Sequence, residues 1–304
     1  MALAAALLKR HLDSLVHGGD LHLERYAEPA GDPGLFGPDS VAWRVNGDLP
    51  GMLCGGIAAL LLQSLHPLAM AGVDQFSDYR ERPVGRLNTT AAFVATTTYG
   101  STRAAEAMIE RVRTVHRAVH GTAPDGRPYR ADDPDLLTWV HVAEMVCFLR
   151  GYEVFGPGRG ALSAADRDRY FTESALIARK LGAARVPVTA RQAGAYLQAT
   201  RPSLRLTPAA RDAARFLRDF GRTPAERVGA RLLFAGAVTL LPPWAARELG
   251  LRQHLLARPP ARLLGGALRA AVQPSPILAA AHGRCLAGTD PGGTEGRGRV
   301  SARR

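Results

Sequence analysis

Residues 133–150 read DPDLLTWVHVAEMVCFLR, and this stretch indicates the class of fold. Asp133 is a typical N-cap residue, and Pro134 suits the first position of a helix, where its missing N–H would be unpaired anyway. The apolar residues that follow are spaced three and four apart, which is the pattern of a helix face. We therefore predict a helix over 134–150, with Trp139 and His141 buried by pattern.

The same kinds of helix start recur along the chain. Two pairs resemble capping boxes and two repeat the cap-then-proline start: Ser163 with Asp166, Thr189 with Gln192, Thr207 with Pro208, and Thr223 with Pro224. Strand patterns are nearly absent, and turn formers mark loops at 121–133 and 156–160. We predict an all-α protein with helices near 3–16, 53–72, 84–98, 101–120, 134–150, 164–182, 190–200, 208–219 and 224–240, and shorter ones after Pro243.

Composition indicates one globular domain with a tail. No long polar linker interrupts the helical segments, so we assign 1–282 to a single domain. Residues 283–304 carry Gly, Pro and Arg without core-forming residues, and we predict a disordered basic tail there. The net charge of +12 is almost entirely arginine, since Lys9 and Lys180 are the only lysines. These arginines are scattered along the sequence, so no specific nucleic-acid partner is predicted.

Cysteine usage and hydropathy bear on the compartment. Cys54, Cys147 and Cys285 fit no metal spacing and no disulfide framework, which is typical of a reducing, cytoplasmic environment. Cys54 and Cys147 lie in apolar runs and are expected in the core. The most apolar stretches, 57–73 and 232–243, are interrupted or shorter than the roughly 20 residues of a spanning helix. For the second stretch, peripheral contact with a membrane stays open.

Polar residues are set into apolar helical sequence between Leu60 and His141. They are Gln63, His66, Arg86, Thr90, His116, His120 and His141. Polar groups on apolar helices cost free energy unless they find partners, so a cluster of them predicts a buried site. Because histidine dominates the cluster, we expect a metal or a cofactor iron there.

Spacing excludes two familiar metal sites. His116 and His120 share a helix face, but a zinc protease would need Glu where Arg117 stands. A di-iron site would need a Glu-x-x-His motif, and Glu110 is followed three residues later by Arg113. A porphyrin iron needs only one imidazole and an apolar pocket, so that class survives. The sequence has no CxxCH motif, which excludes covalent haem attachment.

Simpler structural roles compete with these assignments. By spacing alone, the favoured reading of Arg86 and Thr90 is that Arg86 pairs with Glu81 while Thr90 bonds to its own helix. His66 precedes Pro67, where a helix cap is the simple explanation. Any one of the cluster histidines, taken alone, fits a structural role better than a ligand role. Five others, His11, His17, His22, His254 and His282, are expected to be structural or solvated.

A combined pattern of three segments resembles a known family. LLLQSLHPLAMAGV at 60–73 is followed by RPVGRLNTT at 82–90 and by YGSTRAAEAMIERVRTVHRAVHGTAPDGRPYRADDPDLLTWVH at 99–141. In this order they look like the catalytic domain of rubber oxygenase (latex clearing protein) and MpaB-type oxygenases, best over 43–182. The resemblance implies a globin-like helical core, non-covalent haem b, and chemistry with dioxygen on an isoprenoid or other small hydrophobic substrate.

The family signature assigns roles by resemblance. An Arg, a Thr four residues on and a His about thirty residues later form its haem site, and these match Arg86, Thr90 and His116. His116 would be the proximal iron ligand, with its other ring nitrogen held by an acceptor. Arg86 would neutralise a haem propionate and Thr90 would offer a hydroxyl. His120, His141 and then His66 are the rival ligands.

Other positions depart from the rubber-cleaving members. Those enzymes carry a Lys beside the signature Thr, where this chain has Thr89. They also place an acid before the Arg, and this acid has no clear counterpart here, since the corresponding stretch is LAMAGVDQ with Asp74 as its nearest acid. Other members often have a His where Phe76 stands before Ser77. Rubber is therefore not the expected substrate. The leading hypothesis is a haem oxygenase, followed by a haem carrier or sensor without turnover and then by a basic nucleic-acid or membrane-surface binder.

Overall fold

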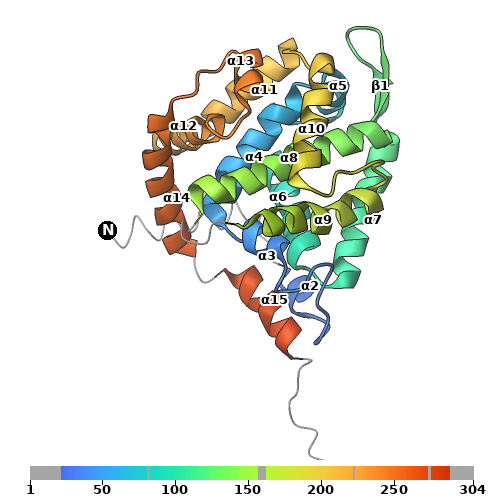
Figure 1. Cartoon of the computed structure of the whole chain (residues 1–304), viewed down its shortest axis with the longest axis vertical. Coiled ribbons are helices and arrows are strands. Elements are labelled where there is room, and N and C mark those ends of the chain that lie inside the picture. Colours follow the sequence, from blue (N-terminus) through green and yellow to red (C-terminus); the bar gives the residue numbers. More distant parts are fainter. Residues whose placement is uncertain (1–21, 81–82, 157–161, 222, 273–274, 288–304) are drawn as a thin grey trace, which may run out of the picture.

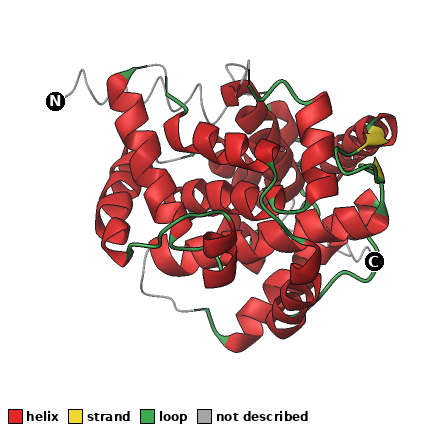
Figure 2. Cartoon of the chain, turned by 90° about the horizontal axis from the view of Figure 1, so that it is seen from above, coloured by secondary structure: helices red, strands yellow, loops and turns green. Residues whose placement is uncertain are grey.

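The computed structural model describes residues 22–80, 83–156, 162–221, 223–272 and 275–287, and almost all of its regular structure is helical (Figures 1 and 2). The elements are α2 (Glu24–Ala27), α3 (Val41–Asn46), α4 (Leu49–Ser64), α5 (Pro67–Phe76), α6 (Pro83–Tyr99), α7 (Thr102–Ala118), β1 (His120–Thr122), β2 (Pro128–Arg130), α8 (Pro134–Phe155), α9 (Ala164–Leu181), α10 (Ala190–Thr200), η1 (Arg201–Ser203), α11 (Pro208–Asp219), α12 (Pro224–Val238), α13 (Pro243–Glu248), η2 (Leu255–Ala257), α14 (Arg258–Val272) and α15 (Pro276–Leu286). The predicted all-α class is confirmed. A globin-like arrangement of the core stays a prediction.

Two buried helices, α4 and α8, form the centre of the molecule and lie antiparallel (Figure 1). At one end of the pair, the Gln63 side chain donates to the Val140 carbonyl at 2.9 Å, and the Trp139 indole donates to the Gln63 carbonyl at 3.3 Å. Gln63, which the sequence placed in the polar cluster, therefore links the two core helices by hydrogen bonds. Cys54 and Cys147 lie in this core as free thiols, as predicted.

Glycines allow α4 and α8 to touch through their backbones. A Cβ atom on Gly55 would lie 2.9 Å from the Cys147 carbonyl oxygen, and one on Gly151 would overlap the carbonyl of Gly51. The 51, 55 and 151 positions therefore tolerate only glycine at this separation. The remaining elements pack around α4 and α8. The distance between these two helices is short because glycines have no side chain at the contact.

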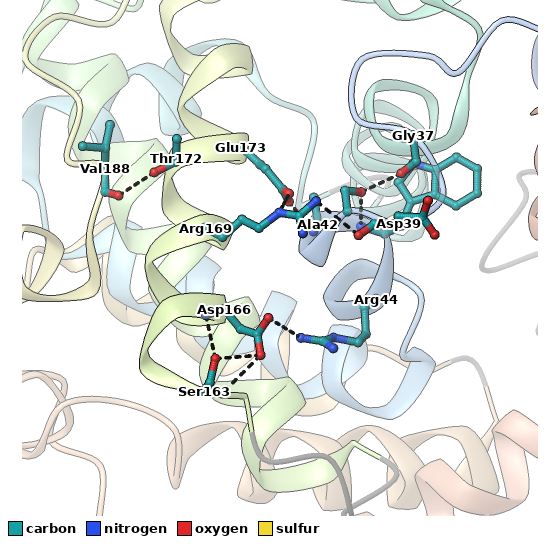
Figure 3. A network of polar contacts seen from close by, with 12 residues as sticks. Gly37, Asp39, Ala42, Arg44, Ser163, Asp166, Arg169, Thr172, Glu173 and Val188 are labelled. Carbon is teal, nitrogen blue, oxygen red and sulfur yellow. Dashed lines mark hydrogen bonds and ion pairs between the residues drawn. The ribbon is translucent and has the colours of Figure 1, made fainter.

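A polar network ties α9 to the loop and helix of α3 (Figure 3). The Glu173 carboxylate accepts from the Ala42 N–H at 2.8 Å, at the start of α3, while Arg44 pairs with Asp166 at 3.2 Å. Asp166 also completes the capping box with Ser163 that begins α9. These contacts hold α3 between α9 and the core.

The predicted helix starts are largely correct. Asp133 caps α8, and the Thr207 and Thr223 hydroxyls cap the helices that begin at the following prolines. The predicted box at Thr189 is incomplete, because the Gln192 side chain accepts from the Val188 N–H instead of the cap residue. Local hydrogen bonding thus explains where most helices begin.

Two predicted elements differ from the structure. The helix predicted over 53–72 is two helices, α4 and α5, bent by 106°. His66 precedes Pro67 and adopts an extended conformation, because proline disfavours the helical region for the residue before it. The predicted loop 121–133 contains the hairpin β1–β2, in which His120 pairs with Arg130. The sequence predicted that His120 shares a helix face with His116. This prediction is wrong, because His120 lies in the hairpin and not on α7.

The helix α15 extends across the predicted boundary at 282. Arg284, assigned to the disordered tail, is 2 % exposed and donates to the carbonyls of Tyr26 at 2.8 Å and Tyr99 at 2.9 Å. The prediction for this part of the tail is wrong, because carbonyls left free by other elements satisfy the guanidinium. Residues 288–304 lie outside the described residues, as does the helix predicted over 3–16.

The structure also addresses the two apolar stretches. Within the described residues, no single helix is long and apolar enough to cross a membrane. The bent pair α4–α5 together has the length and the apolar composition of a spanning segment, and nothing about this pair beyond these two properties points to a membrane. In the second stretch, Leu233, Phe234, Ala237 and Val238 are buried against the core. The peripheral membrane contact considered for 232–243 is therefore unavailable to these side chains.

The backbone contact between α4 and α8 gives a stability prediction. Gly55→Ala should lower the free energy of unfolding by about 1–3 kcal/mol, because its methyl group must push the two helices apart. Its neighbour Gly56 has no atom within 4 Å of a Cβ position, so Gly56→Ala should stabilise α4 by about 0.5–1 kcal/mol. Urea unfolding followed by circular dichroism measures both. Equal effects of the two substitutions would contradict the proposed contact.

Candidate functional site

Arg86 and Thr90 lie one helical turn apart on α6 and share a face. The Arg86 guanidinium donates to the Thr90 hydroxyl at 2.9 Å, and that hydroxyl donates to the Arg86 carbonyl at 3.2 Å. The bond from Thr90 to its own helix matches the simple structural reading of the sequence. The alternative partner for Arg86, Glu81, lies outside the described residues. The pair is therefore a preformed unit that presents one cation.

Protein atoms surround Arg86 although part of its side chain stays exposed. Burial lowers the pKa of this guanidinium, and the carboxylates of Asp78 and Glu144 partly oppose that shift. Arginine stays charged in proteins even so. Arg86 therefore presents a solvent-accessible positive charge to an anionic group.

His116 lies near the C-terminal end of α7, which packs against α6. Its side chain is half-buried, and its Nδ1 atom is buried without a hydrogen-bond partner. Burial lowers the pKa of the imidazole, the charge of Arg86 lowers it further, and Asp132 opposes the shift. His116 is therefore neutral near pH 7, which is the form that binds a metal.

Glu144 is a site residue that the sequence analysis missed. It is a half-buried carboxylate on α8, and burial raises its pKa to about 7, with the charge of Arg86 opposing the shift. Val140, one turn earlier, is 36 % exposed although it lies on the core helix, so this face of α8 stays accessible. Glu144 is a polar residue set into the apolar helical stretch HVAEMVCF, which is the pattern by which the cluster histidines were chosen. The sequence therefore contained a signal that could have identified it.

His141 lies on α8, three residues before Glu144. It is 8 % exposed, its Nε2 atom is buried without a partner, and burial lowers its pKa to about 4. The predicted burial of this residue is confirmed. An unpartnered buried nitrogen keeps His141 as a second ligand candidate, but no electrostatic interaction links it to Arg86 as one links His116.

The other two histidine candidates differ from His116 in their contacts or their exposure. The His66 Nδ1 atom accepts from the Ala69 N–H at 3.5 Å, and its ring lies 5.9 Å from that of Trp139. His66 is thus an N-cap of α5, which was the simple explanation from sequence. His120 is exposed in the hairpin. An exposed imidazole lacks the apolar surroundings that a haem ligand needs.

Arg86, Thr90, His116 and Glu144 form one group, drawn from α6, α7 and α8 and linked by hydrogen bonds or electrostatic interactions. We call it the α6–α7–α8 site. Among the described residues, no group of three or more His, Cys, Asp or Glu side chains is arranged to hold a bare metal ion. An iron held in a porphyrin needs fewer protein ligands, and the unpartnered imidazole nitrogen fits such a group.

Comparison with known proteins identifies one family. The family model described as ER-bound oxygenase mpaB/B'/Rubber oxygenase, catalytic domain, matches residues 43–272. The match extends well beyond the 43–182 segment in which the sequence resemblance was recognised. No curated protein and no solved structure matches the chain.

The raised pKa of Glu144 predicts a pH-dependent stability. The carboxyl holds its proton up to a pH of about 7 in the folded protein but only to about 4.5 when unfolded. Wild type should therefore lose up to roughly 3 kcal/mol of stability from this group between pH 4.5 and 7, and nothing more above that. Glu144→Gln stays neutral and should escape the loss.

Urea unfolding at pH 5 and pH 8 measures this difference between wild type and variant. Glu110→Gln is the matched control, because Glu110 lies exposed on α7 beside Arg113 and Arg117. Its stability difference from wild type should change by less than about 1 kcal/mol. A constant gap between Glu144→Gln and wild type at the two pH values would show that Glu144 is ionised throughout.

Proposed function

We propose a haem-dependent oxygenase activity for this chain, which belongs to the family of ER-bound oxygenase mpaB/B' and rubber oxygenase catalytic domains. The observation that carries the proposal is the position of His116 beside Arg86. A neutral imidazole with an unpartnered buried nitrogen lies within electrostatic range of the Arg86 guanidinium. An iron ligand and an anchor for an acidic group are two of the features that a non-covalent haem site needs.

Each residue of the α6–α7–α8 site then has a role. His116 would hold the iron as the proximal ligand, since burial and Arg86 keep its ring neutral. Arg86 would neutralise a haem propionate, and its hydrogen bond to Thr90 fixes the direction of the guanidinium. The bound haem b would supply the reaction with dioxygen, while the protein supplies orientation and excludes water.

Glu144 would handle protons in this site. A carboxyl whose pKa is about 7 is partly protonated at neutral pH, so it can either accept or donate a proton during turnover. The stretch LAMAGVDQ upstream of Arg86 has no clear counterpart of the acid that the rubber-cleaving members carry. Glu144 provides a carboxylate from α8 instead. The exposed Val140 on the same face would contact a small hydrophobic substrate.

A haem carrier or sensor without turnover is the second candidate function. Thr89 stands where rubber-cleaving members carry Lys, and its hydroxyl donates to the carbonyl of Gly85 at 3.0 Å. It therefore offers neither a positive charge nor a free donor. Glu144 favours the oxygenase over the carrier, because burying a carboxylate at the site costs free energy that a passive carrier would not need to spend.

Haem binding tests the ligand assignment. Titration of the wild-type protein with haem should produce a Soret band of a histidine-ligated iron. His116→Ala should abolish that band, whereas His120→Ala, which removes an exposed imidazole of the hairpin, should leave it unchanged. Loss of the band in His141→Ala alone would transfer the ligand role to α8. A wild type without a Soret band after haem addition would overturn the proposal.

Oxygen consumption separates turnover from carriage. With haem loaded and a panel of terpenoids as substrates, an oxygen electrode should record consumption by wild type. Glu144→Gln should bind haem normally but turn over about 10²–10⁴-fold more slowly, the usual contribution of a positioned proton donor or acceptor. A Soret band without oxygen consumption for any terpenoid would favour the carrier. Unchanged rates in Glu144→Gln would remove that residue from the mechanism.

A further inference from the structure

The exposed face of α14 is apolar along its whole length. Counting from η2, the residues on this face recur three or four apart: Leu256, Pro259, Leu263, Ala267 and Ala270. Because α14 follows η2 without a break, this spacing places them on a single stripe. The opposite face packs against α4 and α12, with Ala261 and Leu268 buried. The helix therefore has apolar residues on both its inner and its outer face.

The outer stripe is far more exposed than a surface helix requires. Leu256 is 88 % exposed and Leu263 is 76 % exposed, while neighbouring Leu255 is 62 % exposed. Figure 1 shows α14 at the outer edge of the molecule, on the side away from α7. Single exposed leucines are ordinary, but a continuous apolar stripe that carries two of them marks an interaction surface.

Three arginines gather where α14 meets α8 and the end of α12. Arg258 lies within electrostatic range of Arg150, on α8, and of Arg262, which is the neighbour of Leu263. The guanidiniums of Arg258 and Arg262 donate to the carbonyl oxygens of Thr239 and Val154, and none of the three arginines forms a salt bridge with a carboxylate of the described residues. A cluster of like charges without a counter-ion favours binding of an anion.

The surrounding sequence adds no negative charge to this surface. Between Leu249 and Thr289 the chain has no Asp or Glu, so the η2–α14 segment itself carries no negative charge, and Glu153 on the neighbouring α8 is paired with Arg167. A second copy of the chain would bring the same arginines against each other across a symmetric interface. An anionic lipid surface would instead match both features, because it accepts leucines between its headgroups and presents phosphates to the arginines.

We propose that the η2–α14 stripe and these three arginines dock this protein onto a bilayer containing anionic phospholipids. Leu256 and Leu263 enter the headgroup boundary, and Arg150, Arg258 and Arg262 bind lipid phosphates at its edge. This contact lies on a different surface from the buried 232–243 stretch and from the α6–α7–α8 site. It does not depend on haem, so it stands or fails independently of the oxygenase proposal.

Vesicle co-sedimentation of the full chain tests the docking. Wild type should bind phosphatidylglycerol–phosphatidylcholine vesicles and should bind pure phosphatidylcholine much more weakly. Leu256→Asp combined with Leu263→Asp should weaken binding by at least about tenfold, because both side chains then avoid the headgroup region. Val115→Asp is the matched control, since Val115 is 54 % exposed on α7, away from α14, and should bind as wild type does.

Charge variants test the second half of the proposal. Arg150→Gln with Arg262→Gln should weaken binding to anionic vesicles by about fivefold per guanidinium and should flatten its salt dependence. Urea unfolding confirms that each variant is folded. Equal binding to neutral and anionic vesicles would overturn the role of the arginines.

Three other outcomes would overturn the docking itself. One is the absence of binding to anionic vesicles by a folded wild type. Another is a wild-type dimer in light scattering that Leu263→Asp converts to a monomer, which would assign the stripe to a second copy of the chain. The last is displacement of the protein from vesicles by duplex DNA at equal phosphate concentration, which would assign the arginines to nucleic acid.

Discussion

Backbone contact between α4 and α8 is the constraint on which the rest of this structure depends. Gly51, Gly55 and Gly151 leave no room for a side chain, so the two helices approach until carbonyls and Cα atoms meet. Core packing penalises both gaps and overlaps, so this separation sets the positions of the elements that surround the pair. The Gln63 and Trp139 hydrogen bonds then fix how far one helix slides along the other.

The candidate site inherits its geometry from that pair. α8 is held on the α4 side by glycines and by Trp139, and its accessible face carries Val140 and Glu144. α6 and α7 bring Arg86 and His116 to the same region, where each group perturbs the pKa of another. Burial supplies the largest part of every one of these shifts. The chemistry proposed for the site therefore follows from desolvation first and from charge pairing second.

Local signals were enough to predict most helices, because caps and prolines act within a few residues. Asp133, Thr207 and Thr223 begin helices as expected. The same reasoning failed where the outcome depended on distant groups. The hairpin around His120 forms by pairing with Arg130, and Arg284 is buried because carbonyls of Tyr26 and Tyr99 lie across the fold. His66 shows the limit within one segment, since its proline neighbour bends a run that hydropathy reads as continuous.

By itself the sequence determined the all-α class and most helix starts, and it indicated the family. Arg86, Thr90 and His116 stay its predicted members of the candidate site. Only the tertiary structure decided which other polar residues join them. It made His66 the cap of α5, left His120 exposed, let Gln63 link the two core helices, and brought Glu144 within electrostatic range of Arg86. The physical reason is that helix formation depends on hydrogen bonds between near neighbours, whereas the ionisation of a side chain depends on every element packed around it.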